Sequence, residues 1–295
     1  PYRRQRQMCI RDRTLFTKSV ARTLLAKIYA EKPLRDYTKV IQYCDEVKAD
    51  GFDLVDDFSD LFGMNAAGTD AKMRNTKESI LEAQFTSGAG NWCTWMFGRD
   101  LVNWNNNFTW AKWVTPSRDL ISAFKQEGDE VRFKESIVYY DCNWSNYYPS
   151  DNYPFMYKCR SANSSIIKYR YADVLLLKAE ALIMQDTPDL EGAADIIDKV
   201  RDRAKLGALP TSVRSNKNVL LNALLKERRL ELAFEGQRWF DLVRLDKVEE
   251  VMNAVYSKDS GRKAQIYTFD KNSYRLPIPQ SVIDANDKIH QNPGY

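Results

Sequence analysis

The sequence predicts a mainly α fold, a tetratricopeptide-like scaffold of helical repeats with an irregular aromatic-rich insert. Three observations support this prediction. Apolar residues recur three or four positions apart before residue 51 and again after residue 166, which is the spacing of amphipathic helices. The pattern Ala-x-x-Leu-Leu-x-Lys occurs at 21–27 and again at 172–178, which indicates an internal repeat. Between the two copies, over residues 52–165, the helical period disappears.

Residues 1–13 differ from the rest of the chain. They contain five arginines and one aspartate, without an initiator methionine or an apolar segment. We expect a stretch without fold, either a disordered basic arm or translated sequencing-adapter sequence, in which case the authentic protein begins near Thr14 as a fragment. These charges account for the net charge of +4. Since the remaining body is neutral, nucleic-acid binding is not expected.

A first helical hairpin is predicted over residues 14–51. Residues 16–30 favour one helix, Lys32-Pro33 interrupts it, and residues 36–50 favour a second helix that Gly51 closes. A single hairpin cannot bury its apolar face alone, so this unit needs neighbours in the array. If an upstream hairpin is missing, we expect one face of this unit to be partly uncovered.

The insert, residues 52–165, is rich in aromatic and amide side chains. Five of the seven tryptophans fall between residues 92 and 113 among asparagines, and a tyrosine-rich cluster at 139–157 follows a short helix expected at 116–126. Aromatic rings stack on the C–H faces of sugars, and amides bond sugar hydroxyls as donors and acceptors. This composition therefore suits a neutral oligosaccharide, and the candidate ligand-binding residues are Trp92, Trp95, Trp104, Trp113 and Asn105. Alternatively, several of these rings form the core of the insert, which could also contain a short β-hairpin.

Two further hairpins are predicted after the insert. In the first, Pro188 and Asp189 begin the second helix and Gly207 closes it; the other runs from Asn218 through Gly236 to about residue 255. Over residues 226–246 the charges almost alternate in sign at a spacing of three, which places opposite charges next to one another on a helix. We therefore interpret the acids there as structural ion pairs: Glu227, Glu231, Glu235 and Asp241. Glycosidase carboxylates, by contrast, face each other across a cleft.

Three motifs in the last part of the chain carry a resemblance. Glu-Arg-Arg-x-Glu-Leu-Ala-x-Glu-Gly-x-Arg-Trp-Phe-Asp-Leu-x-Arg begins at Glu227. Tyr-Arg-Tyr-Ala-Asp-Val-Leu-Leu-Leu-Lys-Ala-Glu-Ala-Leu, at 169–182, leads into Val-Arg-x-Arg-Ala at 200–204, and Leu-Pro-Ile-Pro, at 276–279, leads into Gln-Asn-Pro-Gly-Tyr at 291–295. In kind and order they resemble the SusD/RagB family, surface glycan-binding lipoproteins that work with a TonB-dependent outer-membrane transporter.

This resemblance implies an organisation and a function. Residues 166–295 would be the C-terminal helical domain of the family with its tail, after the basic stretch at 1–13, the hairpin at 14–51 and the insert at 52–165. The protein would capture oligosaccharide without catalysis at the outer-membrane surface and deliver it to a SusC-like TonB-dependent transporter. Its signal peptide and lipidated cysteine would lie upstream of this fragment. The resemblance assigns no ligand contact to an individual tryptophan.

Other kinds of site have little support in the sequence. The five cysteines are odd in number, widely spaced and without a C-x-x-C pair, so we expect buried thiols, with neither a zinc site nor a disulfide framework. His290 is the one histidine and offers no catalytic triad. We expect no cofactor and no metal. Two alternatives to glycan capture stay open, a protein-interaction scaffold and a glycoside hydrolase that uses Glu231 or Glu235.

Overall fold

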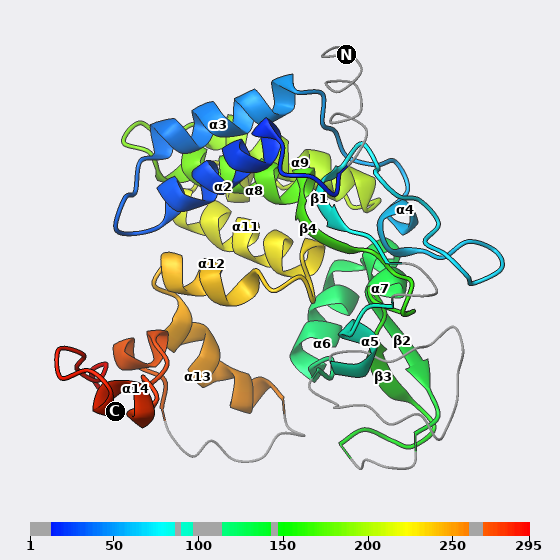
Figure 1. Cartoon of the computed structure of the whole chain (residues 1–295). Helices are drawn as coiled ribbons and strands as arrows, with labels where there is room; N and C mark the ends of the chain where they lie inside the picture. The colour runs from blue at the N-terminus through cyan, green and yellow to red at the C-terminus, as the bar shows by residue number, and fades with distance from the viewer. Residues whose placement is uncertain (1–12, 86–89, 97–113, 143–146, 260–267) are drawn as a thin grey trace, which may run out of the picture. The chain divides into compact units, whose positions relative to one another are not determined.

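The structure, a computed structural model, is mainly α (Figure 1). It describes residues 13–85, 90–96, 114–142, 147–259 and 268–295. The chain divides into two compact units, Pro1–Gly236 and Gln237–Tyr295, each of which is described by itself. Among the described residues, no helix combines the length and the apolar composition that a membrane span requires. The predicted fold class is confirmed.

The first hairpin consists of α2 (Lys18–Ala30) and α3 (Tyr37–Ala49). The side chain of Thr17 accepts a hydrogen bond from the main chain of Val20 at 3.4 Å, and Asp36 accepts one from Lys39 at 3.0 Å. These contacts satisfy main-chain groups that a helix start leaves unpaired. Gly51 follows α3 in the left-handed conformation, with a φ of 91°, as the sequence predicts.

The second hairpin consists of α8 (Tyr171–Met184) and α9 (Leu190–Arg203), and Asp189 caps the start of α9 through the main chain of Gly192 at 2.9 Å. The prediction that Gly207 closes this helix is wrong. Lys205 adopts the left-handed conformation with a φ of 60°, and the main-chain N–H of Leu206 donates to the carbonyl of Arg201 at 2.9 Å. This closing turn is therefore complete before residue 207.

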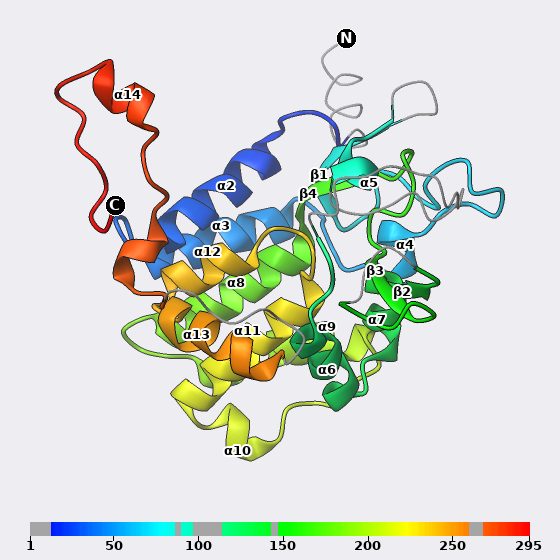
Figure 2. The ribbon, with the colours of Figure 1, turned by 90° about the horizontal axis from the view of Figure 1, so that it is seen from below.

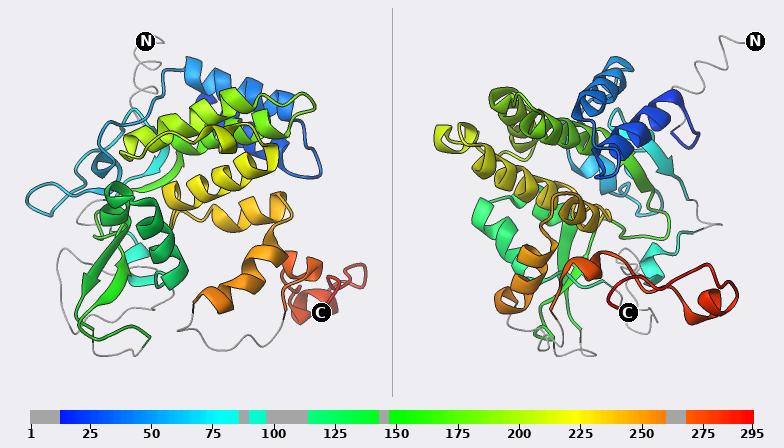
Figure 3. Two further views of the ribbon diagram at one scale, coloured as in Figure 1. Left: turned by 180° about the vertical axis from the view of Figure 1, so that it is seen from behind. Right: turned by 90° about the vertical axis from the view of Figure 1, so that its left-hand side faces the viewer.

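Helix α8 lies at the centre of the helical core. Helices α2, α3, α9 and α11 (Lys217–Glu231) all pack against it (Figure 2), and Figure 3 shows α8, α9 and α11 side by side in green to yellow. Nearly all side chains of α8 are buried, which explains its apolar sequence. The fully buried apolar side chains of this core include Val40, Val47, Leu176, Ile183, Ile197 and Leu220.

The repeated lysine of the Ala-x-x-Leu-Leu-x-Lys pattern makes an interhelical ion pair in both copies. Lys27 on α2 reaches Asp173 on α8 at 2.5 Å, and Lys178 on α8 reaches Asp45 on α3 at 2.5 Å. Asp173 is buried and also accepts a hydrogen bond from Arg228 on α11 at 2.8 Å. The repeated pattern therefore supplies an ion pair between neighbouring helices in addition to an apolar face.

The insert lies between the first two hairpins and contains short elements. Strand β1 (Ser79–Ala83) pairs antiparallel with β4 (Ile166–Arg170), which leads directly into α8. Strands β2 and β3 form an antiparallel hairpin, with Ile137 opposite Met156 and Tyr140 opposite Tyr153. The helix expected at 116–126 is α6. The elements of the insert besides β1 are α4 (Ser59–Phe62), α5 (Cys93–Met96), α6 (Arg118–Glu127), α7 (Glu130–Ser136), β2 (Ile137–Tyr140) and β3 (Tyr153–Met156).

The third predicted hairpin differs from the expectation in both of its helices. Helix α11 ends at Glu231, because Phe234 and Gly236 adopt left-handed conformations with φ of 65° and 76°. In the second unit, Asp246, also left-handed with a φ of 55°, separates α12 from α13, where we expected one helix. The elements of this unit are α12 (Arg238–Arg244), α13 (Val248–Lys258), the 3₁₀ helix η1 (Lys271–Tyr274) and α14 (Gln280–Asp284).

Candidate functional site

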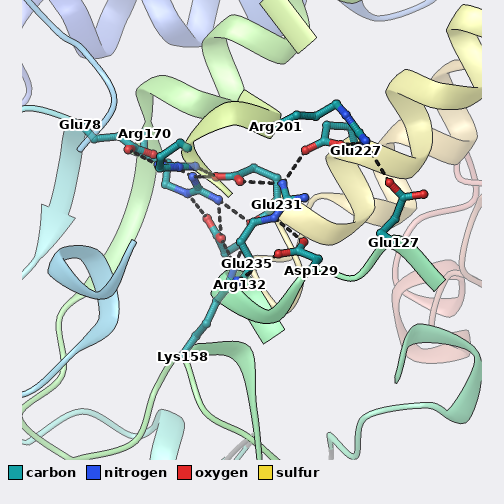
Figure 4. Close-up of polar contacts among 11 residues, drawn as sticks. Glu78, Glu127, Asp129, Arg132, Lys158, Arg170, Arg201, Glu227, Glu231 and Glu235 are labelled. Atoms are coloured by element: carbon teal, nitrogen blue, oxygen red, sulfur yellow. Dashed lines mark hydrogen bonds and ion pairs between the residues drawn. The ribbon is translucent and has the colours of Figure 1, made fainter. Parts of the chain in front are cut away.

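The acidic side chains of α11 and the turn after it lie in a buried network of ion pairs centred on Glu231 (Figure 4). One carboxylate oxygen of Glu231 accepts from Arg170 at 2.5 Å and also pairs with Arg203. Its other oxygen accepts from Arg132 at 3.0 Å. The Glu231 side chain has no solvent exposure. Three guanidinium groups from three different segments therefore converge on one carboxylate.

A second layer of contacts surrounds these groups. Arg170 also reaches Glu78 at 2.8 Å and Glu235 at 2.7 Å, and Glu227 joins Arg132 at 2.5 Å. Among the described residues, this Glu231 network consists of six acids and six cations: Glu78, Glu127, Asp129, Glu227, Glu231 and Glu235 with Arg132, Lys158, Arg170, Arg201, Arg203 and Lys226. The equal numbers of acids and cations matter because removing one partner of a buried ion pair lowers the free energy of unfolding by about 3–5 kcal/mol.

The prediction that these acids form structural ion pairs is confirmed, but the partners predicted for the acids of α11 are wrong. We expected cations three or four positions away on the same helix. Instead, the partners of Glu231 come from α7, from the end of β4 and from α9, and Arg228 pairs with Asp173. Asp241 pairs with Arg244 at 2.8 Å within α12, as predicted. Helical spacing reveals neighbours on one helix and carries no information about tertiary partners.

The network controls the protonation of its carboxylates. Burial alone would raise the pKa of Glu231, but Arg203, Arg170 and Arg132 outweigh burial and hold that pKa well below its ordinary value. At Glu227 the effect of burial is larger than the attraction of Arg132, so the pKa of Glu227 is raised. Burial also lowers the pKa of Lys158 to about 8. A glycosidase acid needs access to substrate and a proton to donate, and Glu231 has neither.

We expect acid to destabilise the protein progressively as the pH falls below about 4.5. The pKa values of Glu231, Glu235 and Asp173 lie below their ordinary values because nearby cations outweigh burial. Their stabilisation is therefore complete above the unfolded-state pKa and is lost as these groups bind protons. Glu227 and Asp129, whose pKa values burial raises, act in the opposite sense and only partly offset the loss. Urea unfolding at a series of pH values measures this dependence, and a free energy of unfolding that stayed constant from about pH 5 to pH 3 would contradict it.

The tyrosine-rich part of the insert forms a second core. Phe155 and Tyr153 are buried on β3, Tyr148 is buried in the β2–β3 connection, and Phe124 from α6 packs into the same cluster. The hydroxyl of Tyr148 donates to the carbonyl of Pro116 at 2.7 Å, so its polar end is satisfied within the protein. For these rings, the alternative that they build the core of the insert is confirmed.

The start of the tryptophan-rich segment is different, because Trp92 lies at the surface with 71% of its area exposed. The preceding Asn91 is buried, and its side-chain amide donates to the carbonyls of Ser161, Ala162 and Ser164 at 2.8–3.2 Å. At Gly90 a Cβ atom would lie 2.9 Å from that of Ala162, so the close approach of the two chains favours glycine. An exposed ring is therefore attached to an anchored main chain.

The other candidate residues are only partly covered by the structure. Trp95 lies in α5, whereas Trp104, Asn105 and Trp113 lie outside the described residues. Of the five candidates, the structure therefore places Trp92 at the surface and Trp95 in α5. The anchoring role of Asn91 was missed, because one asparagine among many in the segment gives no signal of its own. The described residues contain no cluster of three or more histidine, cysteine, aspartate or glutamate side chains placed to hold a metal ion.

Comparisons with known proteins agree with this architecture. Residues 156–295 match the sequence pattern of the SusD family. Two curated relatives from Formosa agariphila are similar: SusD-like protein P38, 43% identical over 99 residues (32% of this chain and 19% of that protein), and SusD-like protein P2, 36% identical over 143 residues (46% and 27%). The matched parts thus span only about a fifth and about a quarter of these relatives.

Solved structures extend the similarity to almost the whole chain. A SusD-like protein from Bacteroides fragilis has a TM-score of 0.70 at 22% identity and covers 97% of this chain, which spans 66% of that protein. A structure described as a laminarin-binding SusD-like protein has a TM-score of 0.66 at 25% identity, covering 95% of this chain and 63% of its own. Residues 156–295 thus match the SusD family, and the curated relatives and the fold agree with that match.

Proposed function

We propose that this protein binds oligosaccharide without catalysis at the outer-membrane surface, as a lipoprotein, and delivers it to a SusC-like TonB-dependent transporter. The observation that carries the proposal is the exposed ring of Trp92 on its anchored main chain, at the start of a segment that contains five tryptophans and several asparagines. The match of residues 156–295 to the SusD family and the similarity of the fold to a laminarin-binding SusD-like protein support it. Trp95, Trp104, Trp113 and Asn105 are the further proposed contacts.

The chemistry of this segment suits a neutral sugar. Flat aromatic rings cover the apolar C–H face of a pyranose, and amides supply donors and acceptors to its hydroxyls without a charge that would have to be desolvated. A ring that is already exposed and held by an ordered main chain loses little conformational freedom on binding. Such preorganisation favours capture of a flexible polymer.

The proposal that binding occurs without catalysis is supported by the buried Glu231 network. The carboxylates of Glu231 and Glu235 have side-chain exposures of 0% and 11%, and both pair with the guanidinium group of Arg170. A retaining or inverting glycosidase instead places two carboxyl groups about 5–10 Å apart on either side of a bound sugar. The acids that the sequence offered for hydrolysis are thus engaged in holding segments of the fold together.

A protein-interaction scaffold without sugar binding is the second candidate, and one observation favours it. Apolar side chains of the first hairpin are solvent-exposed, including Phe16 at 87%, Leu24 at 45% and Ile28 at 38%. Such a surface can pack against another helix or another protein. Copurification with the transporter in the absence of affinity for any polysaccharide would favour this second function.

Replacing Trp92 with alanine is expected to weaken glycan binding by roughly 5- to 150-fold, which corresponds to the loss of about 1–3 kcal/mol when a stacking ring is removed. Calorimetry against a panel of neutral polysaccharides that includes laminarin measures the effect. Trp95→Ala, Trp104→Ala, Trp113→Ala and Asn105→Ala extend the series. Phe16→Ala is the matched control, because it removes another exposed ring outside the tryptophan-rich segment. Unchanged affinity in all five variants of a protein that binds glycan would contradict the proposed site.

A further inference from the structure

Two cysteines from distant parts of the insert meet at one asparagine. The Cys159 thiol donates to the side-chain oxygen of Asn91 at 3.4 Å, and the main-chain N–H of Cys93 donates to the same oxygen at 3.0 Å. The side chains of Cys93 and Cys159 are also close enough for the Cys159 thiol to donate to Cys93 instead. Cys93 begins α5 in the tryptophan-rich segment, whereas Cys159 lies between β3 and β4.

The main chain around this thiol pair is held by several bonds. Besides the three bonds that its side-chain amide donates, Asn91 donates from its main chain to the carbonyl of Ala162 at 2.8 Å. Cys159 is buried and Cys93 is half-buried. Thus both cysteines remain close together in the folded protein, and one of them can be reached by a small reagent.

We propose that Cys93 and Cys159 are a modification site, at which a reversible disulfide fastens the start of the tryptophan-rich segment to the chain between β3 and β4. The oxidant is another disulfide, either a small one such as oxidised glutathione or that of a protein disulfide oxidoreductase. The Cys93 thiolate attacks the oxidant and releases one thiol, and Cys159 then displaces the second. Two protein S–H bonds break, one S–S bond forms, and the oxidant gains the two electrons and two protons.

The surroundings of the two sulfurs favour this reaction over oxidation elsewhere. The hydrogen bond from Cys159 lowers the pKa of Cys93 to about 7 although burial opposes the effect, so a substantial thiolate fraction exists at neutral pH. A thiol with a pKa near the ambient pH is close to optimal for disulfide exchange. Burial instead raises the pKa of Cys44 far above its ordinary value, which makes that thiol unreactive.

The bond would have a mechanical consequence for the insert. It would close a loop that contains the second part of the tryptophan-rich segment, α6, α7 and the β2–β3 hairpin. Closing a long loop restricts the unfolded chain and thereby stabilises the folded one. The anchoring of Trp92, which the four bonds of Asn91 provide in the reduced protein, would become covalent.

The test is oxidation of the whole chain with oxidised glutathione near neutral pH, followed by alkylation, digestion and mass spectrometry. We expect a peptide that joins Cys93 to Cys159 and a rise of about 5 °C in the midpoint of thermal unfolding, reversed by dithiothreitol. Cys93→Ser and Cys159→Ser should each abolish both effects. Cys44→Ser and Cys142→Ser, which replace buried cysteines outside the pair, should abolish neither.

Other outcomes would overturn the proposal. A stable glutathione adduct on Cys93, a different cysteine pair, or retention of both thiols under oxidant would each show that the two sulfurs do not join. The peptide map of the unmodified sequence decides this even if a serine variant folds poorly. Because the assay measures a covalent bond, its result is independent of whether the protein binds glycan.

Discussion

Glu231→Gln is expected to lower the free energy of unfolding by about 3–5 kcal/mol, enough to leave a large part of the protein unfolded. The carboxylate of Glu231 lies between Arg132, Arg170 and Arg203. A neutral amide keeps the volume of the side chain but leaves three guanidinium groups with one buried negative charge fewer. Urea denaturation, monitored by circular dichroism, measures the loss.

A suitable control is Glu130→Gln, which removes the same charge from the exposed surface of α7. Substitutions of this kind usually change stability by about 0.5 kcal/mol or less. A change of similar size in the two variants would show that the Glu231 network contributes little to stability. Polysaccharide hydrolysis by the wild type that disappeared in Glu231→Gln while the protein stayed folded would instead restore the glycoside hydrolase alternative.

Phe155→Ala is expected to cost about 3–5 kcal/mol, because it leaves a cavity in the aromatic core of the insert. Phe155 is 1% exposed and contacts Tyr140 and Tyr153, with ring centroids 6.3 and 5.2 Å away. If these rings are core and not a glycan platform, the fraction that remains folded should bind glycan with unchanged affinity. Thermal unfolding and calorimetry on the same preparation separate the two effects.

Phe16→Ala again serves as the control, since 87% of that side chain is exposed and its loss creates no cavity. The result that contradicts the core interpretation is a Phe155→Ala protein of wild-type stability with weakened glycan binding. That outcome would move the binding surface from the tryptophan-rich segment to the β2–β3 hairpin.

The helical hairpins could be predicted from the sequence because their signals are local. A period of about 3.6 residues and a cap such as Asp189 act within one or two turns. The ends of α9 and α11 were misplaced for a related reason. The usual rule puts glycine in the left-handed position after a helix, whereas Lys205 and Phe234 occupy that conformation here.

The arrangement of the candidate site depends on contacts that no local pattern contains. Glu231 binds arginines from three other segments, and a spacing rule along α11 cannot reveal them. Composition identified an aromatic-rich insert but could not distinguish the buried Phe155 from the exposed Trp92, because both environments favour the same residue types. The close approach of Cys93 and Cys159 likewise follows from how Asn91 folds back onto residues 161–164.

The order of residues in the Glu231 network has a consequence for biosynthesis. Glu78, Arg132, Arg170 and Arg203 leave the ribosome before Glu231, so the cations of the core are made before the acid that neutralises them. Until α11 has emerged, Arg132, Lys158, Arg170 and Arg203 have only Glu78 and Asp129 from the buried part of the network as counterions. Burying that excess positive charge would be costly. We therefore expect the N-terminal segments to stay loosely associated during translation and to close cooperatively when α11 docks.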